Sequence, residues 1–274
     1  MNLATAHSAS THGPPDSITL SVIAPCLNEA GNVDALADRT LRAFDELRTT
    51  AELVLVDDGS TDGTWERIVL RSRADARVRG VRHECNRGIE AAWKTGLAAT
   101  AGELICLIDA DLQNPPEDIP RLYRGYLQEL PDIVQAVRRP KYSDWSRLLM
   151  SRGLNWLLNL AFGSSLGDAK SGFILTRRAV LTEILSHRRD YRYFQSFLGV
   201  AAHVRGYVVG EVESTFERRT AGQSFLGRFP LRTCARILRE IVQFRTEAGQ
   251  LATPIVSPPA WSASMLSGPS PSGG

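Results

Sequence analysis

The chain has 274 residues, of which 43% are hydrophobic and 23% are charged, and its net charge is +2. This length and composition fit a globular protein with a substantial core. Proteins that coat nucleic acid usually carry a much stronger basic excess. We therefore expect no nucleic-acid partner.

Both ends of the chain lack the features of a targeting or membrane segment. Residues 1–17 have neither the basic start nor the apolar core of a signal peptide, and residues 250–274 are uncharged and rich in Ser, Pro and Gly. No apolar run in these stretches reaches the length of a transmembrane helix. We expect two disordered tails and a cytoplasmic protein.

Apolar, strand-like runs alternate with helical patterns between the tails. Strand-like runs occupy 18–25, 52–59, 78–83, 103–111, 132–137, 172–177 and 207–215. Helical spacing occupies 30–48, 62–73, 91–100, 143–163 and 229–246. This alternation is typical of a mostly parallel sheet covered on both faces. The sequence predicts one doubly wound α/β domain over 18–249, with halves at 18–137 and 138–249.

Acidic residues follow the first, second and fourth predicted strands. The segments are 25–29 (Pro-Cys-Leu-Asn-Glu), 57–60 (Asp-Asp-Gly-Ser) and 109–111 (Asp-Ala-Asp). Ligands of open α/β sheets bind outside the carboxyl ends of the strands. Because unpaired carboxylates are costly to bury, we expect these to line a solvent-filled crevice or to hold a cation.

Asp109 and Asp111 form the strongest candidate pair. Alternate residues of an extended chain point the same way, so both carboxylates can converge on one hard divalent cation. The alternative is a turn and helix cap. Asn114, followed by Pro115 and Glu117, makes a good helix start and already supplies that cap. This leaves the two aspartates available for a metal.

Asp57 and Asp58 have a similar ambiguity. Asp and Gly are common in turns, and Asp62 could cap the next helix. The functional interpretation depends on their position, because they lie one crossover away from Asn28 and Glu29, at the same edge of the sheet.

Five segments between residues 22 and 178 share their order and spacing with one known family. They are VIAPCLNEAGNV, ELVLVDDGSTDGTWE, NRGIEAAWKTGL, ATAGELICLIDADLQNPPEDIPRL and DAKSGFILTRR. In these motifs the chain resembles family 2 glycosyltransferases of the GT-A fold, and specifically the polyprenyl-phosphate sugar transferases. The resemblance implies a Rossmann-like half that binds a nucleotide sugar and a smaller half that binds the acceptor.

The resemblance also implies roles for individual residues. Contacts to the base and ribose would come from Pro25, Asn28, Glu29, Asp57 and Asp58. Asp109 would face the ribose and diphosphate, and Asp111 and Gln113 would hold the metal. The family usually binds Mg²⁺ or Mn²⁺, and its chemistry inverts the anomeric centre in a single displacement.

The chain departs from the family in places that concern the acceptor. The N-x-G-K stretch of the bactoprenol enzymes lacks its lysine here, at Ile89, and the S-G-F-R stretch lacks its arginine, at Ile174. Many relatives also carry C-terminal membrane helices, which this sequence does not show. These differences leave the expected donor fold intact.

Basic residues follow the first half. Residues 138–152 hold five of them against the single acid Asp144. In the family, basic residues of this region hold the acceptor phosphate, which makes Arg138, Arg139 and Arg147 candidate ligands. The alternative is a solvated basic face.

Two further segments lie on the acceptor side by resemblance. Ser171 belongs to the S-G-F stretch, and Arg219 belongs to an R-x-x-G-x-S loop that could cover the site with Gly222 as a hinge. An ordinary surface loop is the alternative for the second segment. The basic, amphipathic helix at 229–246 favours packing on its own domain over lying on a membrane, so membrane contact, if it occurs, is peripheral.

Asp168 is the best candidate base of the second half, because it opens the DAKSGF segment where the resemblance puts the acceptor. A turn residue is the alternative. With Asp109 it completes the candidate catalytic pair. The first functional hypothesis is transfer of a hexose from a UDP- or GDP-linked sugar to polyprenyl phosphate at the membrane surface. The alternatives are the same chemistry with a hydroxyl acceptor, and a nucleotide-binding protein without turnover.

Overall fold

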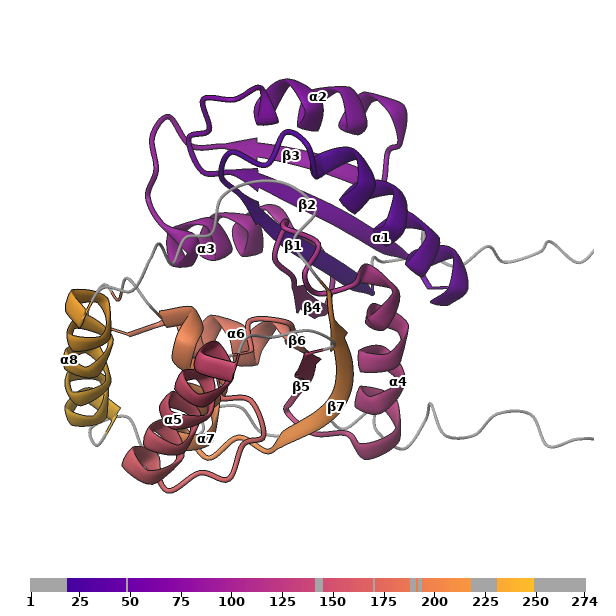
Figure 1. Ribbon diagram of the computed structural model, residues 1–274. Coiled ribbons are helices and arrows are strands. Elements are labelled where there is room, and N and C mark those ends of the chain that lie inside the picture. The colour runs from indigo at the N-terminus through magenta and orange to yellow at the C-terminus, as the bar shows by residue number, and fades with distance from the viewer. Residues whose placement is uncertain are drawn as a thin grey trace, which may run out of the picture.

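A computed structural model describes residues 19–47, 49–140, 145–169, 171–187, 191, 194–217 and 231–248. Its centre is a seven-stranded sheet with the strand order β3-β2-β1-β4-β6-β5-β7 (Figure 1). The strands are β1 (Leu20–Cys26), β2 (Ala51–Asp57), β3 (Val78–Arg82), β4 (Leu104–Leu107), β5 (Ile133–Pro140), β6 (Ile174–Arg177) and β7 (Val209–Phe216).

One strand of this sheet runs against the others. β1 pairs in parallel with β2 and β4, and β2 pairs in parallel with β3. β6 is antiparallel to both of its neighbours, β4 and β5, whereas β5 and β7 are parallel. All strands except β6 therefore end at the same edge of the sheet, and the mostly parallel, doubly wound prediction is confirmed.

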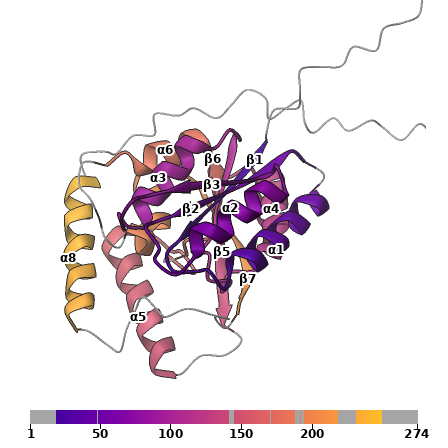
Figure 2. The same ribbon diagram turned by 90° about the horizontal axis from the view of Figure 1, so that it is seen from above.

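Helices cover both faces of the sheet (Figure 2). On one face lie α1 (Val33–Leu47), α2 (Thr64–Ala74) and α4 (Ile119–Glu129), the last preceded by the short helix η1 (Pro116–Asp118). On the other lie α3 (Ile89–Ala99), α5 (Trp145–Phe162), α6 (Arg178–Leu185), η2 (Phe194–Phe197), α7 (Leu198–Val204) and α8 (Leu231–Ala248).

The side chains of the central strands explain why the sequence is apolar almost without interruption there. In β4, Leu104 and Cys106 join the core under α1 and α4, while Ile105 and Leu107 join the core under α3 and α6. β2 alternates in the same way. A strand covered on both faces has no polar side, so alternation disappears from its sequence.

The fourth predicted strand is shorter than expected. The run 103–111 is a strand only over Leu104–Leu107, and a turn begins at Ala110. Asp109 therefore lies beyond the end of the strand and Asp111 lies in the turn, so the expectation that one extended strand carries both was wrong.

Helices α5 and α8 lie side by side at one end of the molecule, away from β1–β3 (Figure 1). The aromatic rings of Phe162 and Phe244 meet at a centroid distance of 6.0 Å where the two helices pack. Among the helices that the structure describes, none is long and apolar enough to span a membrane.

Gly96 lets α3 lie directly on the sheet. A Cβ atom at this position would lie 2.4 Å from Cγ2 of Ile23 and 3.2 Å from Cγ2 of Val56. Gly153, in the middle of α5, is exposed, and a Cβ atom there would meet no described atom within 4 Å.

The two glycines give a matched test of this packing. Alanine improves helix propensity by about 1 kcal/mol, but overpacking a core costs about 1–3 kcal/mol. We expect Gly96→Ala to lower the free energy of unfolding in urea and Gly153→Ala to leave it unchanged or raise it. Equal effects of the two substitutions would contradict the close approach of α3 to β1.

Candidate active site

The candidate site lies where the strand order changes direction, between β1 and β4. The chain runs from β1 outward to β2 and β3, and then crosses back to β4 on the other side of β1. Beyond the strand ends, the ladder continues with Ile108 N–H donating to Ile23 O at 3.1 Å and Asp58 N–H donating to Cys26 O at 2.8 Å. Such a switch point is the usual ligand crevice of open α/β sheets.

The loops after β1 and β2 are bonded to each other along their length. Asn28, in the left-handed region at φ 57°, starts the contact. The bonds run from Asn28 N–H to Ser60 Oγ (2.9 Å), Thr61 N–H to Asn28 Oδ1 (2.9 Å), Glu29 N–H to Thr64 Oγ1 (2.9 Å) and Ala30 N–H to Asp62 Oδ2 (3.2 Å). The two loops form one platform beside the crevice.

Asp57 is fully buried at the end of β2. Its Oδ1 accepts from the backbone N–H of Ser60 at 3.0 Å, and its Oδ2 lies 3.2 Å from Nε of Arg82. The Arg82 guanidinium lies 5.5 Å from the ring centroid of Trp65. The buried carboxylate of Asp57 is therefore paired with a guanidinium that itself remains exposed to solvent.

Asp58 shapes the loop after β3. Its Oδ1 lies 2.7 Å from Nδ1 of His83 and accepts from the N–H of Arg87 at 2.9 Å, while Oδ2 accepts from the N–H of Gly88 at 2.9 Å. Nε2 of His83 in turn lies 2.9 Å from Oγ1 of Thr95 in α3. Asp58 thus fixes residues 86–88, the stretch that lacks the lysine of the bactoprenol enzymes.

Burial and hydrogen bonding set the charge state of two groups beside this platform. Burial, aided by the nearby carboxylate of Glu29, raises the pKa of the Cys26 thiol well above its usual range, so the thiol stays neutral. Partial burial opposes ionisation of Asp62, but donors from Thr64 and Ala30 outweigh it and lower the pKa of Asp62.

The loop after β4 presents Asp109, Asp111 and Gln113. Asp111 is buried, and its Oδ1 accepts from the N–H of Gln113 at 3.0 Å. Leu112 between them takes a left-handed conformation, φ 61°, which turns the loop back on itself. Asp109 is half-buried and accepts from Nδ2 of Asn114 at 3.4 Å.

Asn114 does not cap the following helix as expected. Pro115 is the residue before η1, and Asp118 is the residue before α4; neither makes a side-chain cap. The amide of Asn114 is turned toward Asp109. The prediction that Asn114 caps the helix was therefore wrong. Asn114 instead contacts Asp109 and belongs to the candidate site.

These residues fit a hard divalent cation. Asp111 and Gln113 offer only oxygen ligands, as Mg²⁺ prefers and Mn²⁺ accepts. Across the described part of the chain, no three His, Cys, Asp or Glu side chains cluster in a way that could hold a metal by themselves. A cation here would take its remaining ligands from water and a bound diphosphate, which is how Mg²⁺ is usually held with phosphate substrates.

Asp168 is buried in a turn between α5 and β6. Two asparagines one helical turn apart in α5 hold this turn. Asn155 donates to Leu166 O (3.0 Å) and Gly167 O (3.2 Å) and accepts from Ala169 N–H (2.7 Å), and Asn159 donates to Leu166 O (2.9 Å) and accepts from Leu166 N–H (3.1 Å). From the sheet, Gln135 of β5 donates to Asp168 O at 3.2 Å.

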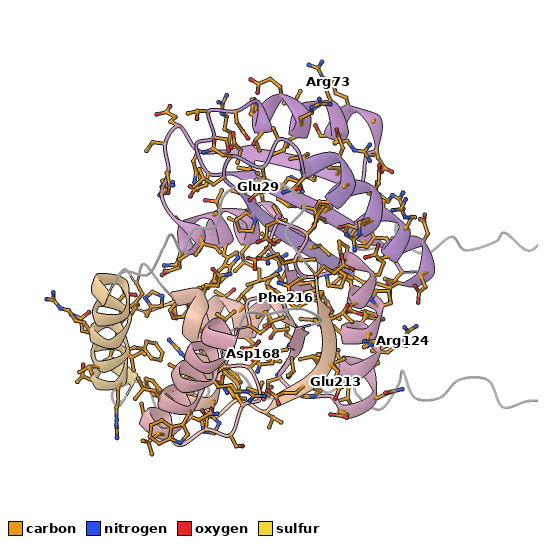
Figure 3. The ribbon with its side chains drawn as sticks, in the orientation of Figure 1. Glu29, Arg73, Arg124, Asp168, Glu213 and Phe216 are labelled. Atoms are coloured by element: carbon orange, nitrogen blue, oxygen red, sulfur yellow. The ribbon has the colours of Figure 1, made fainter. Side chains whose placement is uncertain are left out.

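The residues predicted to bind the donor and those predicted to bind the acceptor lie in different halves of the chain. Glu29 lies in the upper half of Figure 3 and Asp168 in the lower half, beside α5. Pro25 is half-buried near the end of β1, and Ser171 is fully buried, with Oγ 3.5 Å from Phe173 O.

The remaining predicted acceptor residues are arginines. The backbone places Arg138 and Arg139 in β5 and Arg147 in α5, but their side chains lie outside the described part of the structure. Arg219 lies in 218–230, also outside it. Their roles stay predictions.

The loop after β4 is hydrogen-bonded to the second half of the chain by two residues that the sequence analysis did not identify, Gln195 and Glu217. Nε2 of Gln195, in η2, donates to both carboxylate oxygens of Asp109, at 3.0 and 3.2 Å. At the end of β7, Glu217 N–H donates to Gln113 O at 2.9 Å. The sequence could have indicated a role for Asn155 and Asn159, because they are polar residues at helical spacing in an apolar stretch. No sequence pattern indicates a role for Gln195.

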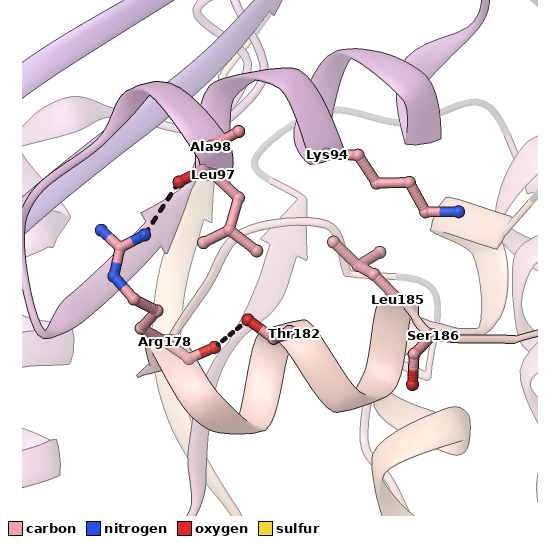
Figure 4. Close-up of a pocket in the computed structure, with 7 residues that line it drawn as sticks. All are labelled: Lys94, Leu97, Ala98, Arg178, Thr182, Leu185 and Ser186. Atoms are coloured by element: carbon pink, nitrogen blue, oxygen red, sulfur yellow. Dashed lines mark hydrogen bonds between the residues drawn. The ribbon is translucent and has the colours of Figure 1, made fainter.

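A separate cavity of about 380 Å³ lies between α3 and α6 (Figure 4). Two of its lining residues are cationic, but Lys94 pairs with Glu90 at 2.6 Å and Arg178 donates to Leu97 O, Gly102 O and Thr100 Oγ1 at 2.8–2.9 Å. No predicted site residue lines this cavity.

A sheet with this order, one reversed strand beyond β4 and oxygen ligands at its switch point defines the GT-A fold of nucleotide-sugar enzymes. Residues 21–185 match the family described as glycosyl transferase family 2. The chain belongs to this family, so the resemblance seen in the motifs is confirmed.

Relatives and solved structures agree with this assignment. The chain is 32% identical to undecaprenyl-phosphate 4-deoxy-4-formamido-L-arabinose transferase of Serratia proteamaculans, over 75% of this chain and 62% of the relative, and 33% identical to that of Edwardsiella ictaluri, over 77% and 64%. The chain thus spans less than two thirds of the length of these curated relatives. Glucosyl-3-phosphoglycerate synthase of Mycobacterium tuberculosis in complex with Mn²⁺, UDP and phosphoglyceric acid has the same fold, with a TM-score of 0.63 at 21% identity over 88% of this chain and 85% of that one.

Proposed function

We propose that this protein transfers a hexose from a UDP- or GDP-linked sugar to polyprenyl phosphate, with a divalent cation and inversion at the anomeric carbon. The observation that carries the proposal is the loop Asp109–Gln113 at the switch point of the sheet, beside the bonded loops after β1 and β2. The names of the curated relatives support a polyprenyl-phosphate acceptor, and the ligands of the Mycobacterium tuberculosis enzyme support a uridine donor with Mn²⁺.

In this proposal the first half binds the donor. The platform of the β1 and β2 loops receives the base and ribose through Pro25, Asn28, Glu29 and Asp57. Asp58 contributes by holding residues 86–88 at the rim of the crevice. Because the loops are bonded to each other before a ligand arrives, little ordering accompanies nucleotide binding.

Asp109 faces the ribose and diphosphate, and Asp111 and Gln113 hold the cation. A cation held by these two residues would neutralise the charge that grows on the departing diphosphate. Asp109 and Asp111 hold their positions through donors from the protein, so the site is aligned before the sugar–phosphate bond breaks.

The second half receives the acceptor near Asp168. A phosphate acceptor is already anionic, so it attacks the sugar without giving a proton to the protein, and arginines hold it: Arg138, Arg139, Arg147 and Arg219 are the candidates, with Ser171 beside them. The second candidate function has a hydroxyl acceptor, and Ile174 in place of the family's arginine favours it. In that case Asp168 acts as the general base.

A surface on α5 and α8 supports contact with the membrane that carries a polyprenyl phosphate. Trp156 and Leu160 of α5 and Val242 of α8 are 66%, 64% and 63% exposed. Exposed arginines accompany them, at 152 in α5 and at 239 and 245 in α8. Helical spacing puts residues 152, 156 and 160 on one stripe, and we propose that this stripe and α8 lie on anionic lipid as a peripheral contact.

Donor binding is expected to need the cation. UDP or GDP at about a hundred times its dissociation constant adds roughly 2.7 kcal/mol of stability, so the melting temperature should rise with Mn²⁺ or Mg²⁺ present and much less in excess chelator. Asp111→Ala should remove the shift and the turnover. Nucleotide binding that is identical in chelator would contradict the metal assignment.

Membrane contact is expected to depend on salt and on the apolar stripe. The protein should co-sediment with anionic vesicles at low salt and dissociate at high salt, because each arginine near the surface contributes about 1 kcal/mol that salt screens. Trp156→Ala with Leu160→Ala should weaken binding. Leu70→Ala serves as the control, since Leu70 is 57% exposed on α2. Equal vesicle binding by both variants would place the contact elsewhere.

Asp168→Asn separates the two acceptor classes. The variant should keep its melting temperature and donor affinity. With a polyprenyl-phosphate acceptor, turnover should fall only modestly; with a hydroxyl acceptor, it should fall by about 10²–10⁴-fold. Steady-state kinetics with each acceptor measure this, and a variant that does not fold would identify Asp168 as structural.

A further inference from the structure

Gln195 bonds to a carboxylate of the opposite half. It lies in η2, far along the chain from β4, yet its Nε2 is 3.0 Å from Oδ1 and 3.2 Å from Oδ2 of Asp109. The two oxygens share one amide donor, so the plane of the carboxylate is set by the position of Gln195. Asn114 donates to Oδ2 from its own side at 3.4 Å.

The backbone at Gln195 is anchored by its neighbour in the hydrophobic core. Its neighbour Phe194 is fully buried and packs on the rings of His187 and Phe244, at centroid distances of 4.6 and 6.0 Å. Because interiors are close-packed, Phe194 holds the backbone of η2 in place. Gln195 therefore reaches Asp109 from a rigid support.

On its other side, the Gln195 side chain packs closely against the backbone of Gly172. A Cβ atom on Gly172 would lie 3.1 Å from Nε2 and 3.2 Å from Cγ of Gln195. The segment 171–173 belongs to the acceptor-side motif, so Gln195 is held between that motif and the donor-side aspartate. Glycine at 172 leaves room for the amide in this one position.

An amide orients a carboxylate without neutralising it. A lysine or arginine at this place would bring a positive charge to Asp109, whereas the amide of Gln195 sets the direction of the carboxylate and adds no charge of its own. We propose that Gln195 is a positioning residue, which aims Asp109 at the ribose and diphosphate of the donor. The inference rests on the proposed donor site and adds a residue from the acceptor half to it.

Two substitutions and their double variant test this role, with UDP and GDP titrated calorimetrically in Mn²⁺. Gln195→Ala removes the bond to a charged group, so the dissociation constant should rise by about ten- to a hundredfold. Gly172→Ala should weaken binding less, by displacing the amide. The double variant should be no weaker than Gln195→Ala alone, because both changes break the same contact.

Gln195→Glu provides a pH profile that a purely structural role would not give. At acid pH the introduced carboxyl is protonated and donates to Asp109, so binding should approach that of the wild type. As the pH rises, the introduced carboxyl ionises, can no longer donate and repels the carboxylate of Asp109, so the ratio of variant to wild-type affinity should fall. Gln128→Glu adds the same charge on the exposed face of α4 and should show no such dependence.

The outcomes separate this inference from the proposed function. If the wild type binds neither UDP nor GDP, both the donor site and the role of Gln195 are overturned. If the wild type binds nucleotide but Gln195→Ala and Gln195→Glu bind it equally well at every pH, the role of Gln195 alone is overturned. Additive losses in the Gly172→Ala and Gln195→Ala cycle would also contradict it, since the two positions would then act independently.

Discussion

Carboxylates stand at the ends of strands that are buried on both faces, where the sheet can no longer supply them with donors. Ionised groups in such places are stable only when they are paired or hydrogen-bonded. Asp57 has Arg82 and Asp58 has His83 with two backbone N–H groups, and these donors come from the neighbouring β3 region. This need explains the arrangement of the loops, because each carboxylate is paired with or hydrogen-bonded to a second segment of the chain at the crevice.

The same requirement joins the two halves of the protein. Asp109 is met by Gln195 from η2, and the carbonyl of Gln113 is met by the N–H of Glu217 at the end of β7. In the proposed function, the loop assigned to the diphosphate is thus supported from the half assigned to the acceptor. If the proposed donor and acceptor sites hold, a shift of η2 or β7 would move the loop assigned to the donor's phosphates.

The sequence was sufficient for the strands and the fold class, because apolar runs, their spacing and the motifs at strand ends are local signals. It was insufficient for the loop after β4. There the extended-chain assumption put Asp109 and Asp111 on one side of a strand, while the chain turns through a left-handed Leu112. Gln195 could not be found, because its significance depends on a contact between residues 86 positions apart. The i,i+4 pair Asn155 and Asn159 could have been found from its polarity in an apolar helix.

The reversed strand β6 has a consequence for how this architecture can be recombined. β6 belongs to the second half by sequence, yet it lies between β4 and β5 and pairs with both. A fragment that ended before β6 would leave the edge of β4 uncovered, and an unpaired apolar edge invites aggregation. Exchanging acceptor halves between relatives, in nature or in the laboratory, therefore requires matching the β4–β6, β5–β6 and β5–β7 pairings at once, so the halves are not interchangeable modules.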